Sequence, residues 1–513
     1  MATKYIATAG NDGTGDGSVG TPWLTLAFAM SEIGASDTLI IVDGDTYAEA
    51  AAATIIPPAN AIVQTQGAVG AEIDVSACDA GEPALKMSYS ASIDGSAGQL
   101  ILDGQTTFDN VLCYISGVTA SLANVTVERN AATNKGVSIE SDAGADTEAT
   151  LTNCIASAVG TDGFSAYYYT AHAGLTITAV FDYCTAVNCG EDGFTSHYGS
   201  CYVRTTGCEA SGGQTGYAPA YGSSWTSRND YLHDNDSASR ATNVYLIGGC
   251  NFVADGLRLG GAQTTHIMVG SPTGAECSAV FTHMLIDPDS SVDAWINLLD
   301  SSGSDADQNM TFQSCMFQGL TASHAIDDTD RSNVRMNLVF DSCVLHLVST
   351  TTAGKYLLVS RDSRATTIVV TNSAIRNDNG NGAYLLNSTA NAAVIRNSIV
   401  RATGNGIAGA VYGSESGYNV VQAGTAFAVS ATAKTGDVSA DAAVDANYVP
   451  LRGGNCDVGC GNPNYRHLGE QDVYGRPKLR GDADCIGPAY PQRKAVENVL
   501  LPVVQFATEA AGN

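Results

Sequence analysis

A five-residue pattern of hydrophobic and polar positions recurs along the chain. It consists of an apolar residue, two variable positions, a small or sulfur-bearing residue and usually a second apolar residue. Successive fourth positions mostly lie about 25 to 31 residues apart, a spacing typical of stacked solenoid repeats. The copies are Leu122-Ala-Asn-Val125-Thr126, Leu151-Thr-Asn-Cys154-Ile155, Phe181-Asp-Tyr-Cys184-Thr185, Phe281-Thr-His-Met284-Leu285, Phe312-Gln-Ser-Cys315-Met316, Phe340-Asp-Ser-Cys343-Val344, Val370-Thr-Asn-Ser373-Ala374 and Ile395-Arg-Asn-Ser398-Ile399.

This pattern predicts strands that pass a corner. The first and third positions cannot share a strand face with the fourth unless the chain bends, and β-branched, aromatic and small residues dominate. A coil of such strands is a parallel β-helix, so the predicted fold class is all-β. At one strand spacing of about 4.8 Å per turn, roughly 14 to 16 turns give a rod of roughly 70 Å.

Helical periodicity is confined to about residues 22–34, where Gly34 is a natural stop. We expect an opening strand and a capping helix in residues 1–34, followed by the β-helix in residues 35–430. Residues 431–490 lose the repeat and gain Pro, Arg and Cys, which predicts an irregular C-terminal closing region. Residues 491–513 form a tail.

The cysteines are predicted to be buried free thiols. Cys154, Cys184, Cys315 and Cys343 share the fourth position of the repeat, where other copies carry Val, Met or Ser. A position that accepts these residues favours a small buried body, which a free cysteine supplies. Outside the repeats, the pairing of Cys456, Cys460 and Cys485 stays open. Their spacing matches no standard zinc site, so we expect no metal and no cofactor.

The charge of the chain limits the classes of partner that it can bind. The net charge is −28, and the 24 Lys and Arg residues are scattered, which argues against nucleic acid and against insertion into or binding to an anionic membrane. A few Arg side chains could still bind an anionic polysaccharide locally. The N-terminus enters a strand without the segments of a secretory signal, so we expect synthesis in a cytoplasm.

Two ends of the sequence resemble a known superfamily. Tyr5-Ile-Ala-Thr-Ala-Gly-Asn-Asp-Gly with Thr21-Pro-Trp-Leu-Thr-Leu and Asp37-Thr-Leu-Ile-Ile-Val is similar to the opening and cap of the pectin-lyase-like right-handed parallel β-helix superfamily. Leu451-Arg-Gly-Gly-Asn-Cys and Asp484-Cys-Ile-Gly-Pro-Ala-Tyr490 resemble its C-terminal ending. The resemblance implies a right-handed coil, but this fold hosts lyases, hydrolases, epimerases and non-catalytic fibres.

An opening strand close to Met1, without an export signal, is similar to bacteriophage tail and virion β-helix proteins. The resemblance implies a virion-associated tailspike or tail fibre that binds host surface polysaccharide, with or without cleaving it. The alternatives are a free-standing, extracellular polysaccharide lyase or glycoside hydrolase, and a non-catalytic virion decoration protein. Other virion proteins are expected partners, and the resemblance implies a homotrimer.

Candidate catalytic residues follow two of the repeats. Asp162-Gly and Asp192-Gly each lie eight residues after a repeat cysteine, so the two aspartates are expected one above the other, with Glu191 beside the second. Paired carboxylates are what glycosidic-bond cleavage requires. Asp-Gly also forms tight turns with positive φ, which is the plainer interpretation. His197 follows the second turn and is a candidate for substrate binding or a solvated surface residue.

A second group of candidates lies in residues 211–240, which break the apolar rhythm. Aromatic rings stack on sugars, and an arginine can bind a carboxylate at two points. We therefore expect a loop over residues 217–233 that either binds glycan or packs its rings against the coil. Its candidates are Tyr217, Tyr221, Trp225, Arg228 and Tyr231 for binding and His233 for catalysis.

The tail carries an apolar strip beyond the predicted end of the coil. Such a strip would be an exposed patch if it stayed in water, and Pro502 makes a regular helix unfavourable. It could fold back along its own rod or pack against a neighbouring copy, and the second interpretation predicts assembly through the tail. The strip consists of Val496, Val499, Leu500, Leu501, Val503, Val504 and Phe506.

Overall fold

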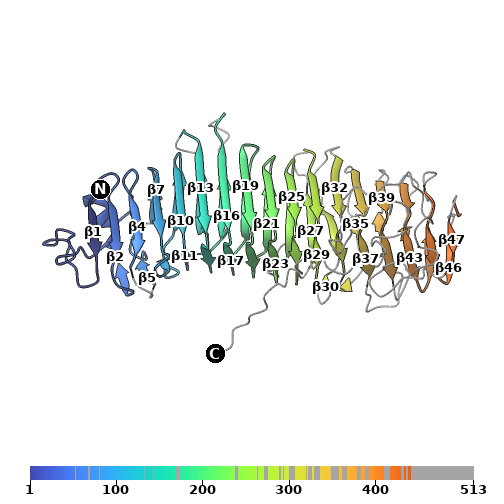
Figure 1. Ribbon diagram of the computed structural model, residues 1–513, viewed down its shortest axis with the longest axis horizontal. Coiled ribbons are helices and arrows are strands. Elements are labelled where there is room, and N and C mark those ends of the chain that lie inside the picture. The colour runs from blue at the N-terminus through green and yellow to red at the C-terminus, as the bar shows by residue number, and fades with distance from the viewer. Residues whose placement is uncertain are drawn as a thin grey trace, which may run out of the picture.

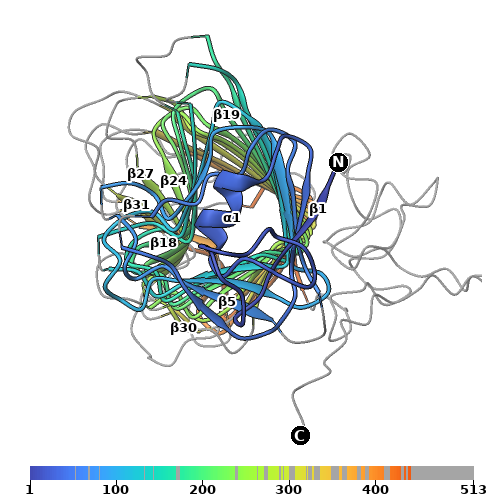
Figure 2. The same cartoon turned by 90° about the vertical axis from the view of Figure 1, so that its left-hand side faces the viewer.

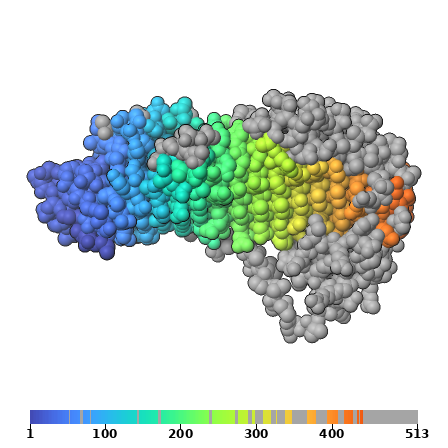
Figure 3. Space-filling view, turned by 90° about the horizontal axis from the view of Figure 1, so that it is seen from above, coloured from blue at the N-terminus to red at the C-terminus, as the bar shows by residue number. Residues whose placement is uncertain are grey.

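The computed structural model gives a single continuous coil of short strands (Figure 1). Its described residues follow one another along the length of a rod (Figure 3). It describes residues 1–440 apart from residues 52, 67–69, 80, 132, 142–143, 169–173, 237–240, 263, 271–274, 288–290, 293, 300–306, 319, 322–325, 329–334, 348–357, 361–366, 378–382, 387–391, 409–415, 429–432 and 435–436. The predicted closing region beyond residue 440, the tail and the pairing of its cysteines lie outside the described residues.

Three long parallel sheets make up the described coil. The first sheet has 15 strands in the order β1 (Thr3–Ile6), β2 (Thr38–Ile41), β4 (Ile62–Thr65), β7 (Ala91–Asp94), β10 (Thr119–Ala123), β13 (Thr147–Thr152), β16 (Ile177–Asp182), β19 (Cys201–Thr206), β22 (Ser224–Arg228), β25 (Asn251–Asp255), β28 (Ser278–Thr282), β32 (Asp307–Gln313), β36 (Arg335–Asp341), β39 (Thr367–Thr371) and β42 (Ala392–Arg396).

The second sheet has 16 strands among the described residues. They are β3 (Thr46–Ala48), β5 (Ala71–Asp74), β8 (Leu100–Asp103), β11 (Val125–Glu128), β14 (Ile155–Ser157), β17 (Thr185–Val187), β20 (Glu209–Ser211), β23 (Tyr231–His233), β26 (Arg258–Leu259), β29 (Leu285–Ile286), β33 (Met316–Phe317), β37 (Val344–Leu347), β40 (Ala374–Asn377), β43 (Ile399–Ala402), β45 (Val420–Gln422) and β47 (Val438–Ser439).

The third sheet has 14 described strands. In chain order they are β6 (Leu85–Met87), β9 (Cys113–Ser116), β12 (Val137–Glu140), β15 (Phe164–Tyr167), β18 (Asp192–His197), β21 (Thr215–Ala220), β24 (Thr242–Ile247), β27 (Thr265–Gly270), β31 (Ala294–Leu299), β35 (Ile326–Asp328), β38 (Leu358–Ser360), β41 (Ala383–Leu386), β44 (Asn405–Ala408) and β46 (Thr425–Ala428). Two short strands, β30 (Ser291–Val292) and β34 (Leu320–Thr321), pair separately.

Each turn of the coil passes from the first sheet to the second and then to the third, as in β10, β11 and β12. Figure 2 looks along the axis from the N-terminal end, and the chain there runs clockwise from β1 through β5 to β18 while it recedes from the viewer. The coil is therefore right-handed, as parallel crossovers almost always are. The predicted parallel β-helix is confirmed.

The repeat marks the corner between the first and second sheets. Its third position has positive φ in each copy, for example 55° at Asn124, 51° at Asn153 and 53° at Asn372. Asparagine tolerates this left-handed conformation better than most residues, which explains its recurrence there. One left-handed residue turns the chain sharply, so the first and fourth side chains both enter the interior.

The interior confirms the predicted thiol stack. Eleven cysteines are free and buried in the described part of the chain. The fourth-position thiols also lie near carbonyls of the preceding turn, since Cys184 Sγ is 3.4 Å from Leu151 O and Cys343 Sγ is 3.4 Å from Phe312 O. First positions form their own column, in which Phe281, Phe312 and Phe340 stack at 5.0 and 4.9 Å with an interplanar angle of 10°.

The first turn is covered by α1 (Leu26–Glu32), which confirms the predicted capping helix. Its N-cap is Thr25, whose hydroxyl accepts the Phe28 N–H, and the buried Glu49 accepts the N–H groups of Leu26 at 2.7 Å and Ala27 at 3.1 Å. These acceptors satisfy backbone donors that a helix start leaves unpaired. With seven residues, α1 is too short to cross a bilayer. The described residues contain no helix that is long and apolar enough to do so.

The predicted loop over residues 217–233 is wrong. The structure continues the regular coil there through β21, β22 and β23. Ser227-Arg-Asn-Asp230-Tyr231 is another copy of the corner, with φ of 54° at Asn229. It escaped the pattern because Ser227 and Asp230 replace the apolar residues of the first and fourth positions.

Candidate functional site

The outer face of the third sheet carries a row of small residues over β12, β15, β18 and β21. Alternation along each strand points the larger residues inward, so that Phe164, Phe194 and Tyr217 lie in the core. The outward row that runs along the coil axis is made of small residues, paired in register as Ser138, Ser165, Thr195 and Ala218. These side chains are at most 2% exposed, so the row, which we call the floor, is covered rather than open to solvent.

A surface cavity of about 390 Å³ lies beside this floor. We call this cavity the third-sheet groove. Its charged and polar lining comes from three consecutive turns and includes Asn134, Lys135, Glu140, Thr161, Asp162 and Glu191. Three carboxylates and one ammonium group therefore share one small volume.

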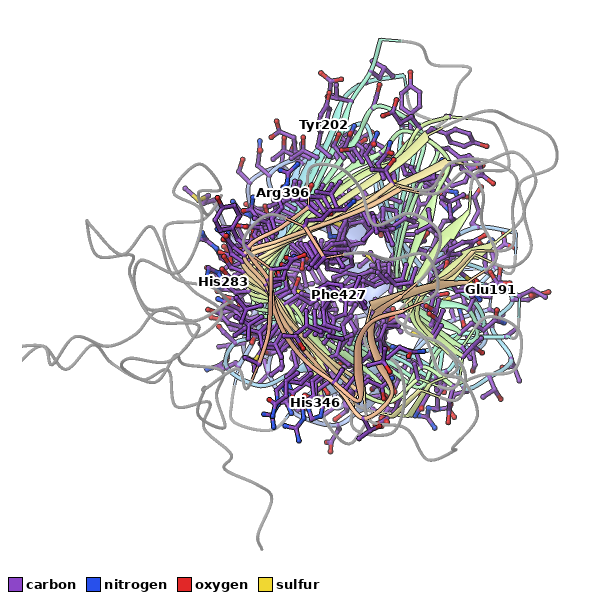
Figure 4. All side chains as sticks on the ribbon, turned by 90° about the vertical axis from the view of Figure 1, so that its right-hand side faces the viewer. Glu191, Tyr202, His283, His346, Arg396 and Phe427 are labelled. Atoms are coloured by element: carbon purple, nitrogen blue, oxygen red, sulfur yellow. The ribbon has the colours of Figure 1, made fainter. Side chains whose placement is uncertain are left out.

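The carboxylates differ in their surroundings. Glu140 is buried and accepts a hydrogen bond of 2.6 Å from Ser138 Oγ, which fixes its side chain against the floor. Asp162 is buried at the cavity wall, whereas Glu191 is exposed and projects outward from the coil (Figure 4). The groove thus offers one solvated carboxylate and two that are shielded from water.

Asp162 and Asp192 occupy equivalent positions on neighbouring turns. Phe164 pairs with Phe194, and the Gly163 N–H donates to Asp192 O at 2.9 Å. Only Asp162 and Glu191 of the three predicted acids line the cavity, because Asp192 begins β18 and is buried beside it.

The Asp-Gly pairs do not form the tight turns with positive φ that their sequence predicts. None of Asp162, Gly163, Asp192 or Gly193 has positive φ. Glycine is needed at 163 for space instead: a Cβ atom there would lie 2.9 Å from Cys189 Sγ and 2.7 Å from Gly193 O. Asp162 therefore lies two residues before β15 and Asp192 is the first residue of β18, and neither is in a tight turn.

Four rings from successive turns border the opposite edge of the floor, and we call them the aromatic rim. They are Tyr167, His197, Tyr198 and Tyr221. The ring centroids of Tyr167 and His197 are 5.2 Å apart, and Tyr198 stacks on Tyr221 at 5.4 Å with an interplanar angle of 22°. Rows of partly exposed rings are surfaces on which sugar rings stack.

Two members of the aromatic rim have left-handed backbones, with φ of 74° at Tyr198 and 52° at Tyr221. This conformation costs about 1 to 2 kcal/mol for a residue with a Cβ atom. Both residues lie where the chain passes from the third sheet to the first, so their left-handed backbones turn the chain at this corner, as Asn153 does at the other.

Lys135 links the two edges of the groove. It lies two residues before β12, next to Asp162 of the following turn, and its Nζ lies 5.0 Å from the ring centroid of Tyr167. Burial, with the neighbouring Tyr198 hydroxyl, raises the pKa of Tyr167 to about 12, so this phenol stays neutral. The contact is then a cation–π interaction rather than an ion pair.

The other predicted residues lie on different parts of the coil. Tyr217 and Trp225 are buried in the interior, at 0 % and 2 % exposure, where no sugar can stack on them. Arg228 ends β22 on the first sheet, and Tyr231 and His233 are on the second. These residues do not share one face with Asp162, because residues 217–233 extend through parts of all three sheets.

Tyr231 and His233 belong to a separate cluster on the second sheet. Their rings stack at 4.2 Å, and His233 makes contacts of 2.8 Å with both Glu209 and Asp234. Arg258 lies 4.5 Å from the ring centroid of Tyr231 and is 2.7 Å from Asp287. These side chains satisfy one another, as in a structural network of ion pairs.

Lys135, Glu140, Tyr167 and Tyr198 were missed by sequence reasoning. The sequence did contain a signal for Lys135, because Lys135-Gly136 aligns with Asp162-Gly163 and Asp192-Gly193 on the next two turns. A glycine column before each strand of the third sheet would have placed Lys135 beside Asp162. Nothing in the local sequence distinguishes Glu140 or the two tyrosines from other strand residues.

Comparisons with known proteins give distant similarities. No family model and no curated protein matches the sequence. Among solved structures, a rhamnogalacturonan lyase has 16% identity and a TM-score of 0.36, covering 59% of this chain and 84% of its own. An endo-xylogalacturonan hydrolase from Aspergillus tubingensis has 13% identity and a TM-score of 0.36, covering 72% and 95%.

Pectate lyase Pel9A covers 96% of this chain and 97% of its own, with 12% identity and a TM-score of 0.22. At these TM-scores, none of the similarities identifies an activity, a substrate or an oligomeric state for this chain. The virion origin and the trimer are not among the similarities and stay predictions.

Proposed function

We propose that this protein binds a polysaccharide in the third-sheet groove and hydrolyses a glycosidic bond there. The main support for this proposal is the cavity lined by Asp162, Glu191 and Glu140, which lies beside the floor that the aromatic rim borders. Rings hold a sugar through its apolar face, while carboxylates supply the acid and the base of hydrolysis. Both requirements meet within one groove.

The proposed roles follow from exposure. Glu191 is exposed and can reach the oxygen of a glycosidic bond or a water molecule in the groove. Asp162 comes from the preceding turn and faces the same cavity as the second carboxylate. Lys135 and Glu140 border the sugar that would lie between them.

Charge favours hydrolysis over elimination. A lyase acting on a uronate needs a cation against the substrate carboxylate in addition to a base. The groove holds one lysine against three carboxylates, and that lysine already contacts Tyr167. A neutral stretch of polysaccharide fits this field better than a polyuronate.

The test measures reducing ends released from neutral xylan, galactomannan and host-envelope polysaccharides. Asp162→Asn or Glu191→Gln should lower release at least a hundredfold, as for loss of a catalytic acid or base, while the folded coil persists by circular dichroism. His233→Gln on the second sheet is the matched control and should stay active.

The wild type could be retained by these polysaccharides without releasing reducing ends. That result would support binding and contradict hydrolysis. If these polysaccharides do not retain the wild type and it releases reducing ends from none of them, the proposal is overturned. Full activity in both variants would place the chemistry elsewhere.

The biological setting that we propose is a virion whose polysaccharide target lies on the host surface. It is supported by the resemblance of the opening strand close to Met1 to bacteriophage tail and virion β-helix proteins. Mass spectrometry of purified particles tests it: a stoichiometric amount of this chain supports a tailspike, tail fibre or decoration protein. Absence from particles and presence in the culture medium would favour the free-standing extracellular enzyme.

A further inference from the structure

The outer face of the first sheet carries a second cavity, of about 330 Å³, over β16, β19, β22 and β25. It is lined by polar and aromatic side chains that include Thr178, Tyr202, Arg204, Ser224, Thr226 and Asn251. Figure 4 shows Tyr202 and Glu191 projecting from different sides of the coil, so this cavity is separate from the third-sheet groove. We call it, together with Tyr183 and Val253, the first-sheet surface.

Exposed apolar residues gather on this surface. Between Tyr89 and Val438, the large apolar side chains that the structure shows as exposed are Tyr183 at 63%, Tyr202 at 50% and Val253 at 47%. All three belong to turns of the first sheet within the strand range β16–β25. Parallel sheets normally have both faces covered, so an uncovered face with clustered tyrosines indicates a contact surface.

The two tyrosines form platforms at the two ends of β19. Tyr202 lies at its start, beside Thr178 and Ser224 of the adjacent strands. The ring of Tyr183 lies over Gly207 just beyond its end, 2.7 Å from where a Cβ atom of that glycine would stand. Five residues of extended chain separate 202 from 207, which is about 17 Å, or roughly three sugar units.

The lining beside Tyr202 and Arg204 suits a carbohydrate better than a protein. Thr178, Ser224, Thr226 and Asn251 present hydroxyl and amide groups on the outward side of the strands. The centre of a protein–protein interface is instead enriched in apolar and aromatic residues and poor in serine. Sugars have many hydroxyl groups and require such polar partners beside an aromatic platform.

Charge complementarity specifies the kind of sugar. On a chain of net charge −28, the described basic residues between Lys135 and Arg258 are Arg204 and Arg228, and both end on the outer side of the first sheet. Arg204 is 58% exposed, and its Nη2 is 3.6 Å from Asp182, which is too long for a hydrogen bond. Arg204 thus forms a long, solvent-exposed ion pair with Asp182, which a ligand carboxylate can displace because the two side chains are not hydrogen-bonded.

We propose that the first-sheet surface is a second glycan-binding site, which takes an acidic oligosaccharide segment of about three residues along β19. Tyr202 and Tyr183 stack on its terminal sugars, and Arg204 binds a carboxylate between them. This site does not depend on chemistry in the third-sheet groove.

The test is affinity electrophoresis in native gels that contain polygalacturonate, alginate or hyaluronate, each compared with its carboxyl-reduced form. At least one acidic polymer should retard the wild type, and its reduced form should not. Tyr202→Ala and Arg204→Gln should each weaken the apparent affinity at least fivefold. Tyr89→Ala, at another exposed tyrosine away from this surface, should leave retardation unchanged.

Three results would overturn the proposal. One is no retardation in any of the acidic polymers, and another is retardation that survives both Tyr202→Ala and Arg204→Gln. The third is an oligomer in light scattering that Tyr202→Ala converts to monomers, which would make this face an interface between copies. Because the groove is tested with neutral polymers and different variants, each site can fail without the other.

Discussion

Asp230 Oδ1 accepts the backbone N–H of Cys208 on the preceding turn at 2.7 Å. Both residues occupy the fourth position of the corner repeat, and Ser373 accepts the N–H of Cys343 in the same way at 3.0 Å. An oxygen-bearing residue at this position therefore binds the backbone of the turn before it. The thiols at the same position lie against a carbonyl instead, as Cys208 Sγ does at 3.2 Å from Phe181 O.

Removal of the Asp230 carboxylate should destabilise the coil. Its oxygens also accept hydrogen bonds from Thr205 at 2.5 Å and Ser227 at 2.6 Å. Asp230→Ala leaves these buried donors unpaired, at an expected cost of about 2 to 4 kcal/mol in the free energy of unfolding. Urea unfolding followed by tryptophan fluorescence measures it, and a change below about 0.5 kcal/mol would contradict the assignment.

The stability conferred by Asp230 should also depend on pH. Burial raises the pKa of this carboxyl above its ordinary value of 3.8, although the bonds from Ser227, Thr205 and Cys208 lower it. The folded chain therefore holds the proton more tightly than the unfolded chain. This contribution is complete below 3.8 and is lost as the pH rises through the raised pKa.

Asp230→Asn removes that dependence, because an amide does not ionise. The unfolding free energy of the wild type minus that of Asp230→Asn should fall as the pH rises from 4 to 7. Parallel pH profiles for the two proteins would show that burial does not raise this pKa.

A methyl group at Gly163 should be poorly tolerated. It would approach Cys189 Sγ and Gly193 O more closely than van der Waals contact allows. We expect Gly163→Ala to cost about 1 to 3 kcal/mol in unfolding free energy, as overpacked interiors do. Gly20→Ala is the control, since no atom lies within 4 Å of the added methyl there. Equal stability of the two variants would refute the steric explanation.

Tyr198 should contribute more to binding than to stability. Asparagine accepts the positive φ of 74° at this position but cannot stack on Tyr221. Tyr198→Asn should therefore change the unfolding free energy by less than about 1 kcal/mol while it weakens polysaccharide retention several-fold. Unfolding and affinity electrophoresis on the same sample separate the two effects. Unchanged retention would remove Tyr198 from the proposed site.

His233 should stabilise the second sheet in a defined pH range. Its hydrogen bond with Glu209 raises the pKa of His233 above 6.5, although burial opposes this. The folded state thus favours the imidazolium, and its contribution is complete below 6.5 and is lost as the pH rises through the raised value. The melting temperature of the wild type minus that of His233→Gln should be larger at pH 6 than at pH 9.

Glu209→Gln provides the matching measurement. The same hydrogen bond with His233 lowers the pKa of Glu209, so removal of its charge should bring the pKa of His233 back toward 6.5. A nuclear magnetic resonance titration of the His233 ring reads this directly. An unchanged titration in Glu209→Gln would exclude the pair as the cause.

The coil was predictable because its corner is local. Positions such as Leu151, Asn153 and Cys154 carry an apolar contact, a left-handed turn and a small buried body, each visible in five residues. Ser227 and Asp230 hid one corner, because their burial depends on partners in the preceding turn. Hydrogen bonds that pair buried polar groups between turns cannot be detected in the local sequence.

The candidate site was predictable in part. Asp162 and Glu191 stood out because they lie at Asp-Gly pairs that follow repeat cysteines, and both line the groove. Tyr217 and Trp225 stood out as aromatic, but strand alternation directs them into the interior. The register of one strand decides between a binding surface and a core, and a single inserted residue reverses it.

The buried thiols allow the local opening of individual turns of the coil to be measured. They are distributed along the rod from Cys78 to Cys343, and burial raises the pKa of several of them, including Cys201 to about 12. A protected thiol reacts with an alkylating reagent only when its turn opens, so the labelling rate of each cysteine reports the opening of one turn. In a solenoid, where each unit contacts only its neighbours, such rates would show whether unfolding begins at an end or within the rod.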